Sequence, residues 1–441
     1  MDATTLFIVS LFLLVGCAVV AGELASRLGQ AALVGQLAVG IVLGPTLLGP
    51  VLGLTGVSTQ LSGLEILATF FVLMTAGLAI TPEQIYATGL AAGVLGVAIF
   101  VLPFATGAYV VRFLYPELPW STSLFVALAI SITAVPVLGV MLSELDLLRS
   151  RFGTFLLNGA LVNELAAVTT FSVLLRVTTG GGTSPWLGAT VAVVTVGIFL
   201  SSILAVHTAL RSLRQLRLWD RLVLRVRAEW HSREVGFALL MVGGLAAALY
   251  SQAIGLTFLV GAFYAGLLVT PESVGVREHR QISQVFDAVT WGFFIPLFFA
   301  LVGFGMNLRS LAASPEALAA FAGLCAFAFL VKVAVGGAVA RALGWSPRSA
   351  IGAGFLVASR GAVELAMAII LLSLGVFTTT IFTVVAGVGL VTTFLSPIGA
   401  RPYVRAVGSP ATTPVPRTNP AGWSPRLGGE PASGPDASLK P

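Results

Sequence analysis

The fold of this chain is decided by residues 121–143, which read STSLFVALAISITAVPVLGVMLS. The run carries no charge and has the length of a membrane-spanning helix, which needs roughly 20 mostly apolar residues. Its centre contains Ser131, Thr133 and Pro136, and a proline removes a backbone donor and disrupts a helix. We therefore expect a spanning helix that is interrupted near its middle.

The composition of the whole chain indicates an integral membrane protein. The 441 residues are 57% hydrophobic and 10% charged, whereas soluble domains carry about 25% charged residues. The formal charge is +6, but the basic residues fall in loops and in the tail, so no nucleic-acid partner is expected. Cys17 and Cys325 lie in apolar runs and indicate packing rather than a disulfide or metal site. No basic stretch precedes the first run, where Asp2 is the only charged residue, so we expect a true first span and no cleavable signal peptide.

The apolar segments predict an all-α polytopic protein of about 13 transmembrane helices. The predicted spans are 4–22, 31–49, 63–81, 88–112, 121–143, 152–177, 186–207, 235–252, 255–271, 286–307, 315–341, 349–374 and 377–399. The pair 235–252 and 255–271 has almost no linker, and a merged span there would give twelve helices.

The distribution of arginines favours thirteen spans and an N-terminus outside, because cytoplasmic loops carry an excess of Lys and Arg. On that count the inside loops hold Arg27, Arg149, Arg151, Arg211, Arg214, Arg217, Arg221, Arg225, Arg227, Arg233, Arg277, Arg280, Arg341, Arg348, Arg401 and Arg405. The outside loops hold Arg112, Arg176 and Arg309. We predict a multi-pass protein of the cell (inner) membrane with a cytoplasmic C-terminus.

Two polar segments flank or interrupt the predicted transmembrane domain, 1–405. The basic segment 208–234 suits a helix lying along the cytoplasmic interface, or a solvated linker that also sets the topology. Residues 406–441 are rich in Pro, Gly, Ser and Thr and are expected to form a disordered cytoplasmic tail.

The two halves of the chain match each other in order, at offsets of 226 to 228 residues. The matches are Val34-Gly35…Gly40…Pro45 with Val260-Gly261…Gly266…Pro271, Phe70-Phe71-x-Leu73…Gly77 with Phe298-Phe299-x-Leu301…Gly305, and Ser131-x-x-Ala134-Val135 with Ser359-x-x-Ala362-Val363. The offset spans an odd number of helices, so equivalent helices point in opposite directions. We expect two inverted six-helix repeats, 1–180 and 235–400, joined by a linking helix at 186–207. Small residues recurring for helix packing are the alternative.

The third match pairs the interruption at 131–136 with Ala-Ser-Arg-Gly-Ala-Val-Glu at 358–364, where Gly361 permits unwinding. Two interrupted helices at matching positions indicate a transport site, because freed carbonyls can coordinate a cation and half-helix ends carry partial charge. A proline kink and an unrelated glycine packing contact are the alternative.

Few charges lie at membrane depth, namely Glu164, Lys332, Arg360 and Glu364. Each costs about 2.5–3.5 kcal/mol at a helix centre, so we expect them to be paired or used. Glu164 follows Asn163, and a carboxyl group removed from water is more easily protonated. One carboxyl that holds either a proton or a monovalent cation, never both, would give exchange. A glutamate hydrogen-bonded across helices for packing is the alternative.

Lys332 is the only lysine besides Lys440, which lies in the tail. A buried lysine can lose its proton whereas arginine cannot in practice, so Lys332 is expected to tune the charge of the site. A fixed or snorkelling structural cation is the alternative. Arg360 and Glu364 lie four residues apart and are expected to neutralise each other and the half-helix dipoles, with direct cation binding by Glu364 as the minor alternative.

These residues resemble the sodium/proton exchanger superfamily, in particular its bacterial cation:proton antiporter branch with the Kef-type transporters. The resemblance covers about residues 5–400. It is carried by 35–45 (GQLAVGIVLGP), Phe70-Phe71…Ala76-Gly77-Leu78, the interruption at 131–136, Leu161-Val162-Asn163-Glu164, Val331-Lys332 and 359–365 (SRGAVEL).

The resemblance implies a homodimer with a scaffold domain and a mobile core, two crossing broken helices and an elevator motion. Glu164 stands where the family has its ion-binding Asp, and Lys332 where it has a Lys or Arg that pairs with the first residue of the motif. That residue is the neutral Asn163 here, which the family associates with electroneutral exchange. The nucleotide-binding regulatory domain common in Kef-type proteins is not expected in this chain.

We therefore expect a secondary transporter, not an enzyme, that exchanges Na⁺ or K⁺ for H⁺ in the lipid bilayer without a cofactor, with Na⁺ ahead of K⁺. Glu164, Asn163, Ser131 and Thr133 would form the cation and proton site. A sodium-coupled organic anion symporter is the first alternative and a channel the second. An intramembrane enzyme is the third, although His207, His231 and His279 lie at cytoplasmic ends or loops and predict no mid-membrane cluster.

Overall fold

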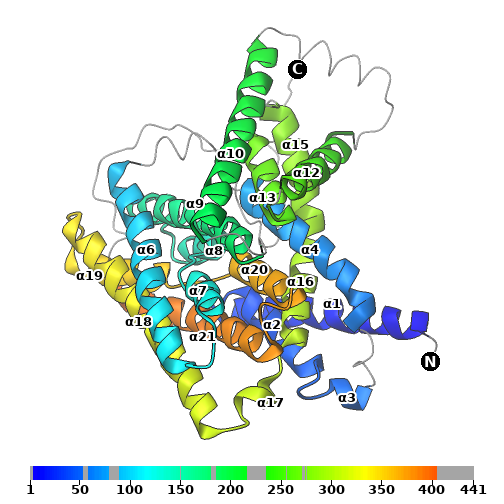
Figure 1. The fold of residues 1–441 in the computed structure, drawn as a ribbon, viewed down its shortest axis with the longest axis vertical. Helices are drawn as coiled ribbons and strands as arrows, with labels where there is room; N and C mark the ends of the chain where they lie inside the picture. The colour runs from blue at the N-terminus through cyan, green and yellow to red at the C-terminus, as the bar shows by residue number, and fades with distance from the viewer. Residues whose placement is uncertain are drawn as a thin grey trace, which may run out of the picture. The chain divides into compact units, whose positions relative to one another are not determined.

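A computed structural model describes residues 3–52, 58–78, 89–148, 150–179, 185–215, 235–254, 256–270, 274 and 276–404. Within this part of the chain the regular structure is entirely helical (Figure 1). The helices are α1 (Ala3–Arg27), α2 (Ala32–Leu43), α3 (Gly49–Leu52), α4 (Ser58–Leu78), α6 (Leu90–Leu114), α7 (Trp120–Ala129), α8 (Val135–Glu144), α9 (Arg151–Thr179), α10 (Pro185–Gln215), α12 (Val235–Ala253), α13 (Phe258–Leu268), α15 (Val276–Val289), the π-helix η2 (Thr290–Phe294), α16 (Ile295–Gly305), α17 (Leu308–Leu311), α18 (Pro315–Ala342), α19 (Pro347–Val357), α20 (Ala362–Ser373) and α21 (Thr379–Val404).

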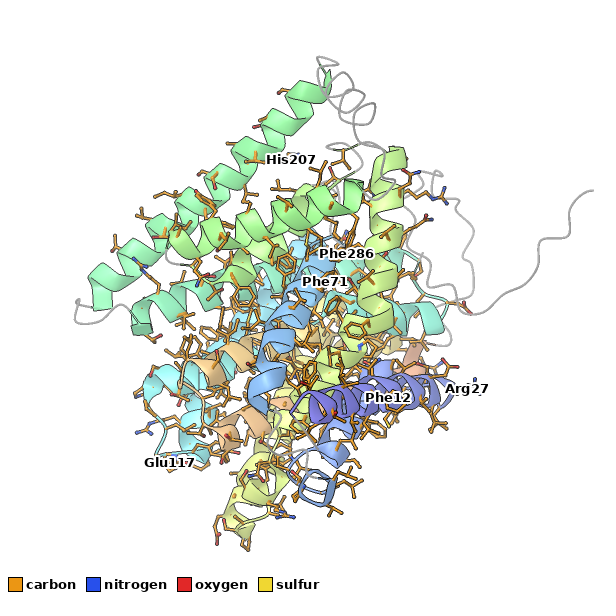
Figure 2. All side chains as sticks on the ribbon, turned by 90° about the vertical axis from the view of Figure 1, so that its right-hand side faces the viewer. Phe12, Arg27, Phe71, Glu117, His207 and Phe286 are labelled. Atoms are coloured by element: carbon orange, nitrogen blue, oxygen red, sulfur yellow. The ribbon has the colours of Figure 1, made fainter. Side chains whose placement is uncertain are left out.

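The helices are apolar on faces that no other helix covers, as a bilayer solvent requires. Phe12 on α1 is 72% exposed and points away from the other helices, whereas Phe71 and Phe286 stack in the interior at a centroid distance of 5.2 Å (Figure 2). Among the described residues, nine helical segments are long and apolar enough to cross a membrane, and shorter apolar helices accompany them.

Each of the thirteen predicted spans contains a helix, and the all-helical class is confirmed. The ambiguous pair is two helices, since α12 ends at Ala253, α13 begins at Phe258, and the two pack against each other. The count of thirteen membrane crossings stays a prediction.

Both predicted interruptions are present. The helix at 121–143 breaks between α7 and α8, over 130–134, and the helix at 349–374 breaks between α19 and α20, over 358–361. The two breaks lie against each other, because a Cβ on Gly361 would come within 2.8 Å of side-chain atoms of Ala134 and Val137. Gly361 therefore permits the close approach of the second break to the first.

A contact made by α1 and α2 is repeated by α12 and α13. A Cβ on Gly35 would lie 2.1 Å from the carbonyl oxygen of Ala21, and a Cβ on Gly261 would lie 2.2 Å from that of Ala247. The same number of residues separates Gly35 from Gly261 and Ala21 from Ala247. An internal repeat requires this kind of paired equivalence.

The glycines at the next helix crossings correct one sequence match. A Cβ on Gly77 would lie 1.9 Å from the carbonyl oxygen of Phe263, and a Cβ on Gly303 would lie 2.2 Å from that of Leu37. Gly77 and Leu37 in the first repeat are separated from Gly303 and Phe263 in the second by the same number of residues. The contact of Gly77 with Phe263 therefore corresponds to the contact of Gly303 with Leu37, and Gly77 is equivalent to Gly303. The match of Gly77 with Gly305 was wrong by two residues, because apolar letters alone do not show which small residue meets the neighbouring backbone.

The helices pack as two groups. The first contains α1, α2, α4, α12, α13 and α16, and the second contains α6, α7, α8, α9, α18, α19 and α21 (Figure 1). Contacts of α20 with α4 and of α21 with α2 and α16 join the groups, while α10 packs against α9 and α13. The first break lies within the second group, and the second break joins α19 of that group to α20.

The linking helix is longer than predicted, since α10 continues from the expected end at 207 to Gln215. The first residues of the basic segment 208–234 are thus a continuation of that helix, because its Leu, Arg and Gln residues are good helix formers. The remainder of that segment, 216–234, and the predicted tail, 406–441, lie outside the described residues.

Candidate functional site

Asn163 on α9 ties down the first break. Its side-chain oxygen Oδ1 accepts a hydrogen bond from the backbone N–H of Thr133 at 2.8 Å, and its Nδ2 donates to the carbonyl oxygen of Ser131 at 2.9 Å. Backbone groups freed by a helix break must be paired when they are buried. Asn163 supplies one acceptor and one donor to the break and so holds its geometry.

Glu164 is fully buried beside the same break. Its Oε2 accepts from the backbone N–H of Val135 at 3.4 Å, at the first residue of α8, where the helix dipole favours negative charge. Its Oε1 has no hydrogen-bond partner among the described residues. A buried carboxylate oxygen without a partner is costly, so Oε1 is a position at which a proton or a cation would be stabilised.

Lys332 on α18 is also fully buried and faces the end of α7. Its Nζ donates to the carbonyl oxygen of Ser131 and, at 2.7 Å, to Oγ1 of Thr133. Within the described part of the chain, no carboxylate lies at salt-bridge distance from it. Lys332 is therefore satisfied by the oxygen atoms of the break and not by an acidic partner.

Two further contacts join the breaks to each other. Thr133 donates through Oγ1 to the carbonyl oxygen of Val357 at 2.7 Å, and the N–H of Ala134 donates to the carbonyl oxygen of Ser359 at 3.4 Å. Ser131 contributes through its carbonyl, because its hydroxyl donates to the carbonyl oxygen of Ala127 on α7 at 2.6 Å.

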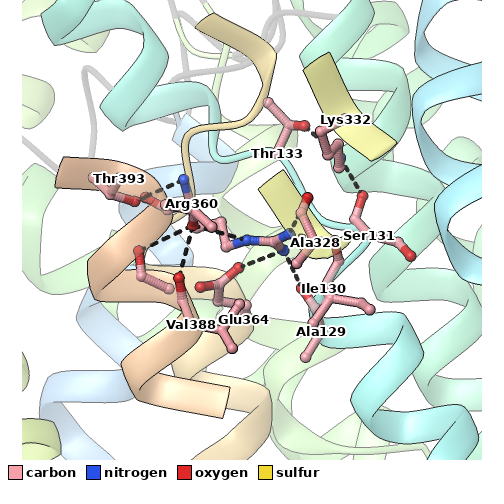
Figure 3. A network of polar contacts seen from close by, with 12 residues as sticks. Ala129, Ile130, Ser131, Thr133, Ala328, Lys332, Arg360, Glu364, Val388 and Thr393 are labelled. Atoms are coloured by element: carbon pink, nitrogen blue, oxygen red, sulfur yellow. Dashed lines mark hydrogen bonds and ion pairs between the residues drawn. The ribbon is translucent and has the colours of Figure 1, made fainter. Parts of the chain in front are cut away.

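Arg360, in the second break, binds the end of the first half-helix. Its Nη1 donates to the carbonyl oxygen of Ala129 at 2.9 Å and its Nη2 to that of Ile130 at 2.5 Å (Figure 3). Nη2 also lies 3.4 Å from the carbonyl oxygen of Ala328 on α18. The guanidinium thus meets the C-terminal carbonyls of α7, where a helix dipole is negative.

Glu364 lies in the first turn of α20, and its Oε2 is 3.6 Å from Nη1 of Arg360. Neither of its carboxylate oxygens has a hydrogen-bond partner among the described residues. A Cβ on Gly389 of α21 would lie 2.3 Å from Oε1 of Glu364, so the carboxylate occupies the space that this glycine leaves. The Arg360–Glu364 pair is therefore a close ionic contact in which the arginine is also bound to backbone.

Sequence reasoning missed Thr392 and Thr393 on α21. Thr392 accepts through Oγ1 from Nε of Arg360 at 3.1 Å. Thr393 accepts through Oγ1 from the N–H of Arg360 at 2.9 Å and donates to the carbonyl oxygen of Arg360 at 3.0 Å. A sequence signal for them existed. This adjacent polar pair interrupts the apolar span 377–399, which follows the second interrupted helix, as Asn163 and Glu164 interrupt the span that follows the first interrupted helix.

The structure thus brings the predicted site residues into one buried region. Ser131, Thr133, Asn163 and Lys332 are in direct contact, and Glu164 is bound to the start of α8 next to them. Arg360 and Glu364 lie on the other side of the first break. Among the described residues, no three His, Cys, Asp or Glu side chains gather as a metal cluster would require.

A family model described as "Sodium/hydrogen exchanger, transmembrane" matches residues 9–406. The chain belongs to this family. It is a multi-pass membrane protein of sodium/hydrogen exchanger type, which confirms the resemblance drawn from the sequence.

Three relatives of this sodium/hydrogen exchanger family member are proteins named as antiporters. The chain is 30% identical over 399 residues to Cation/H(+) antiporter 18 of Arabidopsis thaliana, which covers 87% of this chain and 46% of the plant protein. It is 26% identical over 384 residues to the Na(+)/H(+)-K(+) antiporter GerN of Bacillus cereus (86% and 91% covered). It is 28% identical over 425 residues to the Na(+)/H(+) antiporter NhaS4 of Synechocystis sp. (91% and 99% covered). The chain therefore spans less than half of the plant relative and nearly all of the two bacterial ones.

The structure of the sodium proton antiporter MjNhaP1 from Methanocaldococcus jannaschii has the same fold. The match has a TM-score of 0.70 and covers 92% of this chain and 98% of the other, at 13% sequence identity. The expected antiporter-type helical fold is thereby confirmed.

Proposed function

We propose that this protein is a secondary transporter that exchanges a monovalent cation for protons, with Glu164 as the shared site. The observation that carries the proposal is the fully buried Glu164 carboxylate, which receives one backbone N–H at the start of α8 and leaves Oε1 without a partner among the described residues. A proton and a cation would compete for this carboxylate, and that competition couples their movements.

Lys332 is proposed to tune this competition by occupying the oxygens that a cation needs. The carbonyl oxygen of Ser131 already accepts from both Asn163 and Lys332, and Oγ1 of Thr133 accepts from Lys332. A cation at Glu164 could use these oxygens only when the ammonium group withdraws. Asn163 would keep the break in place during this change.

We further propose that Arg360 and Glu364 compensate the dipoles of the broken helices. The contacts of Arg360 with the last carbonyls of α7 support this role, as does the position of Glu364 in the first turn of α20. Cations at helix C-termini and anions at N-termini are each worth about 0.3–1 kcal/mol at exposed sites and more when partly buried.

Alternating access is proposed to occur by an elevator motion of the second helix group against the first. The support is that both breaks and all seven predicted site residues lie on helices of the second group or on α20, and that the two groups share few contacts. The proposed assembly is a homodimer. Each protomer would contain the inverted repeats 1–180 and 235–400 and have its N-terminus outside.

The cation is proposed to be Na⁺ ahead of K⁺, since the name of GerN includes both ions and that of NhaS4 includes Na⁺ alone. The comparisons do not favour the alternative of a sodium-coupled organic anion symporter, because the relatives reported above are named as antiporters.

The test is cation-driven proton movement in proteoliposomes. An acid-inside pH gradient is imposed, a fluorescent ΔpH probe is followed, and Na⁺, K⁺, Li⁺ or an impermeant cation is added outside. We expect one alkali ion to collapse the gradient with wild-type protein. Glu164→Gln should reduce the response to that of protein-free liposomes while the variant remains monodisperse, because the amide cannot carry the exchanged proton.

The matched control is Glu117→Gln, which changes an exposed acid in the loop between α6 and α7 (Figure 2) and should leave the response unchanged. Exchange by Glu164→Gln at the wild-type rate would exclude Glu164 as the shared site. If no cation dissipates the gradient in wild-type protein, the exchange proposal itself fails.

A further inference from the structure

The second break is held from α21 in the way that the first is held from α9. Asn163 lies 30 and 32 residues after the two break residues that it binds, Thr133 and Ser131. Thr393 lies 33 residues after Arg360 and likewise accepts from a backbone N–H and donates to a backbone carbonyl of the break. Each of the two side chains therefore supplies one acceptor and one donor to the backbone of its break.

Thr393 is fully buried, and its hydroxyl satisfies both backbone groups of Arg360. With the Thr393 hydroxyl removed, these two buried groups lose their partner, and an unsatisfied buried polar group is costly. Thr392 completes the arrangement. Its hydroxyl donates to the carbonyl oxygen of Val388 at 2.8 Å, and its Oγ1 accepts a hydrogen bond from Nε of Arg360. The backbone of Arg360 and the Nε of its side chain are thus both positioned by α21.

The position of Arg360 reaches the cation site through the first break. Its guanidinium holds the carbonyls of Ala129 and Ile130, which immediately precede Ser131. The carbonyl of Ser131 is the atom shared by Asn163 and Lys332. A shift of the second break would therefore displace the oxygens of the first break that Lys332 binds, without any change in the residues that line the site.

We propose that Thr393 is a positioning residue of the exchange site, which fixes the second break and, through Arg360, the oxygen atoms of the first break that Lys332 binds. This inference rests on the proposed function, because the quantity that it predicts is the affinity for the exchanged cation. Thr393 acts through Arg360 and is not itself a ligand.

The experiment compares Thr393→Val with Thr393→Ser in the proteoliposome assay, with the cation concentration varied. Valine keeps the shape but removes the donor and the acceptor, whereas serine keeps both. We expect Thr393→Val to raise the apparent KM for the cation about tenfold, the effect of losing hydrogen bonds of ordinary strength, with a maximal rate per folded protein within about twofold of wild type by the same argument. Thr393→Ser should restore the wild-type KM.

The matched control is Thr75→Val on α4, which removes a buried hydroxyl that, among the described residues, is bonded only within its own helix, to Phe71 at 2.9 Å. It should leave the KM unchanged. If Thr393→Val lowers the amount of folded protein but exchanges with the wild-type KM, or if Thr393→Ser shows the same KM increase as Thr393→Val, the positioning role is overturned. A wild-type protein without exchange would instead overturn the proposed function, so the two failures are distinct.

Discussion

At the scale of single residues, the site places four buried ionisable side chains around backbone atoms. Glu164 and Glu364 lie near the starts of half-helices, and Lys332 and Arg360 lie at the end of α7. Charges at membrane depth are kept when they are paired or used. Here the pairing is largely with carbonyl and N–H groups that the helix breaks release.

Lys332→Arg is expected to shift the pH profile of exchange and to slow it. Arginine does not lose its proton in proteins, and its planar guanidinium cannot reproduce the contacts of one Nζ with both Ser131 and Thr133. The measurement is exchange rate against pH in proteoliposomes, with Arg341→Lys at the exposed end of the same helix as control. A pH profile identical to that of the wild type would reduce Lys332 to a structural cation.

At the scale of helices, the repeat is visible in pairs of glycine contacts that exchange under one shift. Gly77 meets the backbone of Phe263, and Gly303 meets that of Leu37. Small residues allow helix backbones to approach closely in membranes, where no hydrophobic force drives helices together. These crossings hold the first helix group as a unit.

Gly77→Ala is expected to destabilise the protein by about 1–3 kcal/mol, the usual cost of overpacking a tight contact. Its Cβ would lie 1.9 Å from the carbonyl oxygen of Phe263, so the helices α4 and α13 must separate. Gly93→Ala on α6 is the control, because no atom of the described residues outside the neighbouring backbone of α6 lies within 4 Å of the added Cβ. Thermal unfolding in detergent should show a lower midpoint for Gly77→Ala alone, and equal midpoints would contradict the packing argument.

At the scale of the whole molecule, the predicted membrane topology can be tested at the two ends of α18. This helix has 28 residues and is therefore about 42 Å long, more than the roughly 30 Å of a bilayer core. Ala313 and Leu343 flank it and are both exposed. The predicted orientation puts Ala313 outside and Leu343 in the cytoplasm.

Single cysteines at these two positions, in a background without Cys17 and Cys325, should react oppositely with a membrane-impermeant maleimide. Ala313→Cys should be labelled in intact cells, and Leu343→Cys only after the membrane is permeabilised. The reverse pattern would show the opposite orientation. Labelling of both in intact cells would show that α18 does not cross the membrane, and the thirteen-span prediction would be wrong.

Much of the fold and of the candidate site was predictable from the sequence by itself. Composition decides that the bilayer is the solvent, and the matching segments 131–136 and 358–364, which contain Pro136 and Gly361, interrupt two apolar runs. A charge in an apolar run is conspicuous because it is costly there, and for this reason Glu164 and Lys332 could be found without coordinates.

Only the tertiary structure decided which atoms meet. The equivalence of Gly77 with Gly303, the contacts of Thr393 with Arg360 and the extension of α10 depend on contacts between distant segments or on local continuity that hydropathy does not report. The partners of Lys332 and Arg360 are mostly backbone carbonyls. Every residue carries a carbonyl, so no side-chain pattern marks the ones that a helix break turns toward a buried charge.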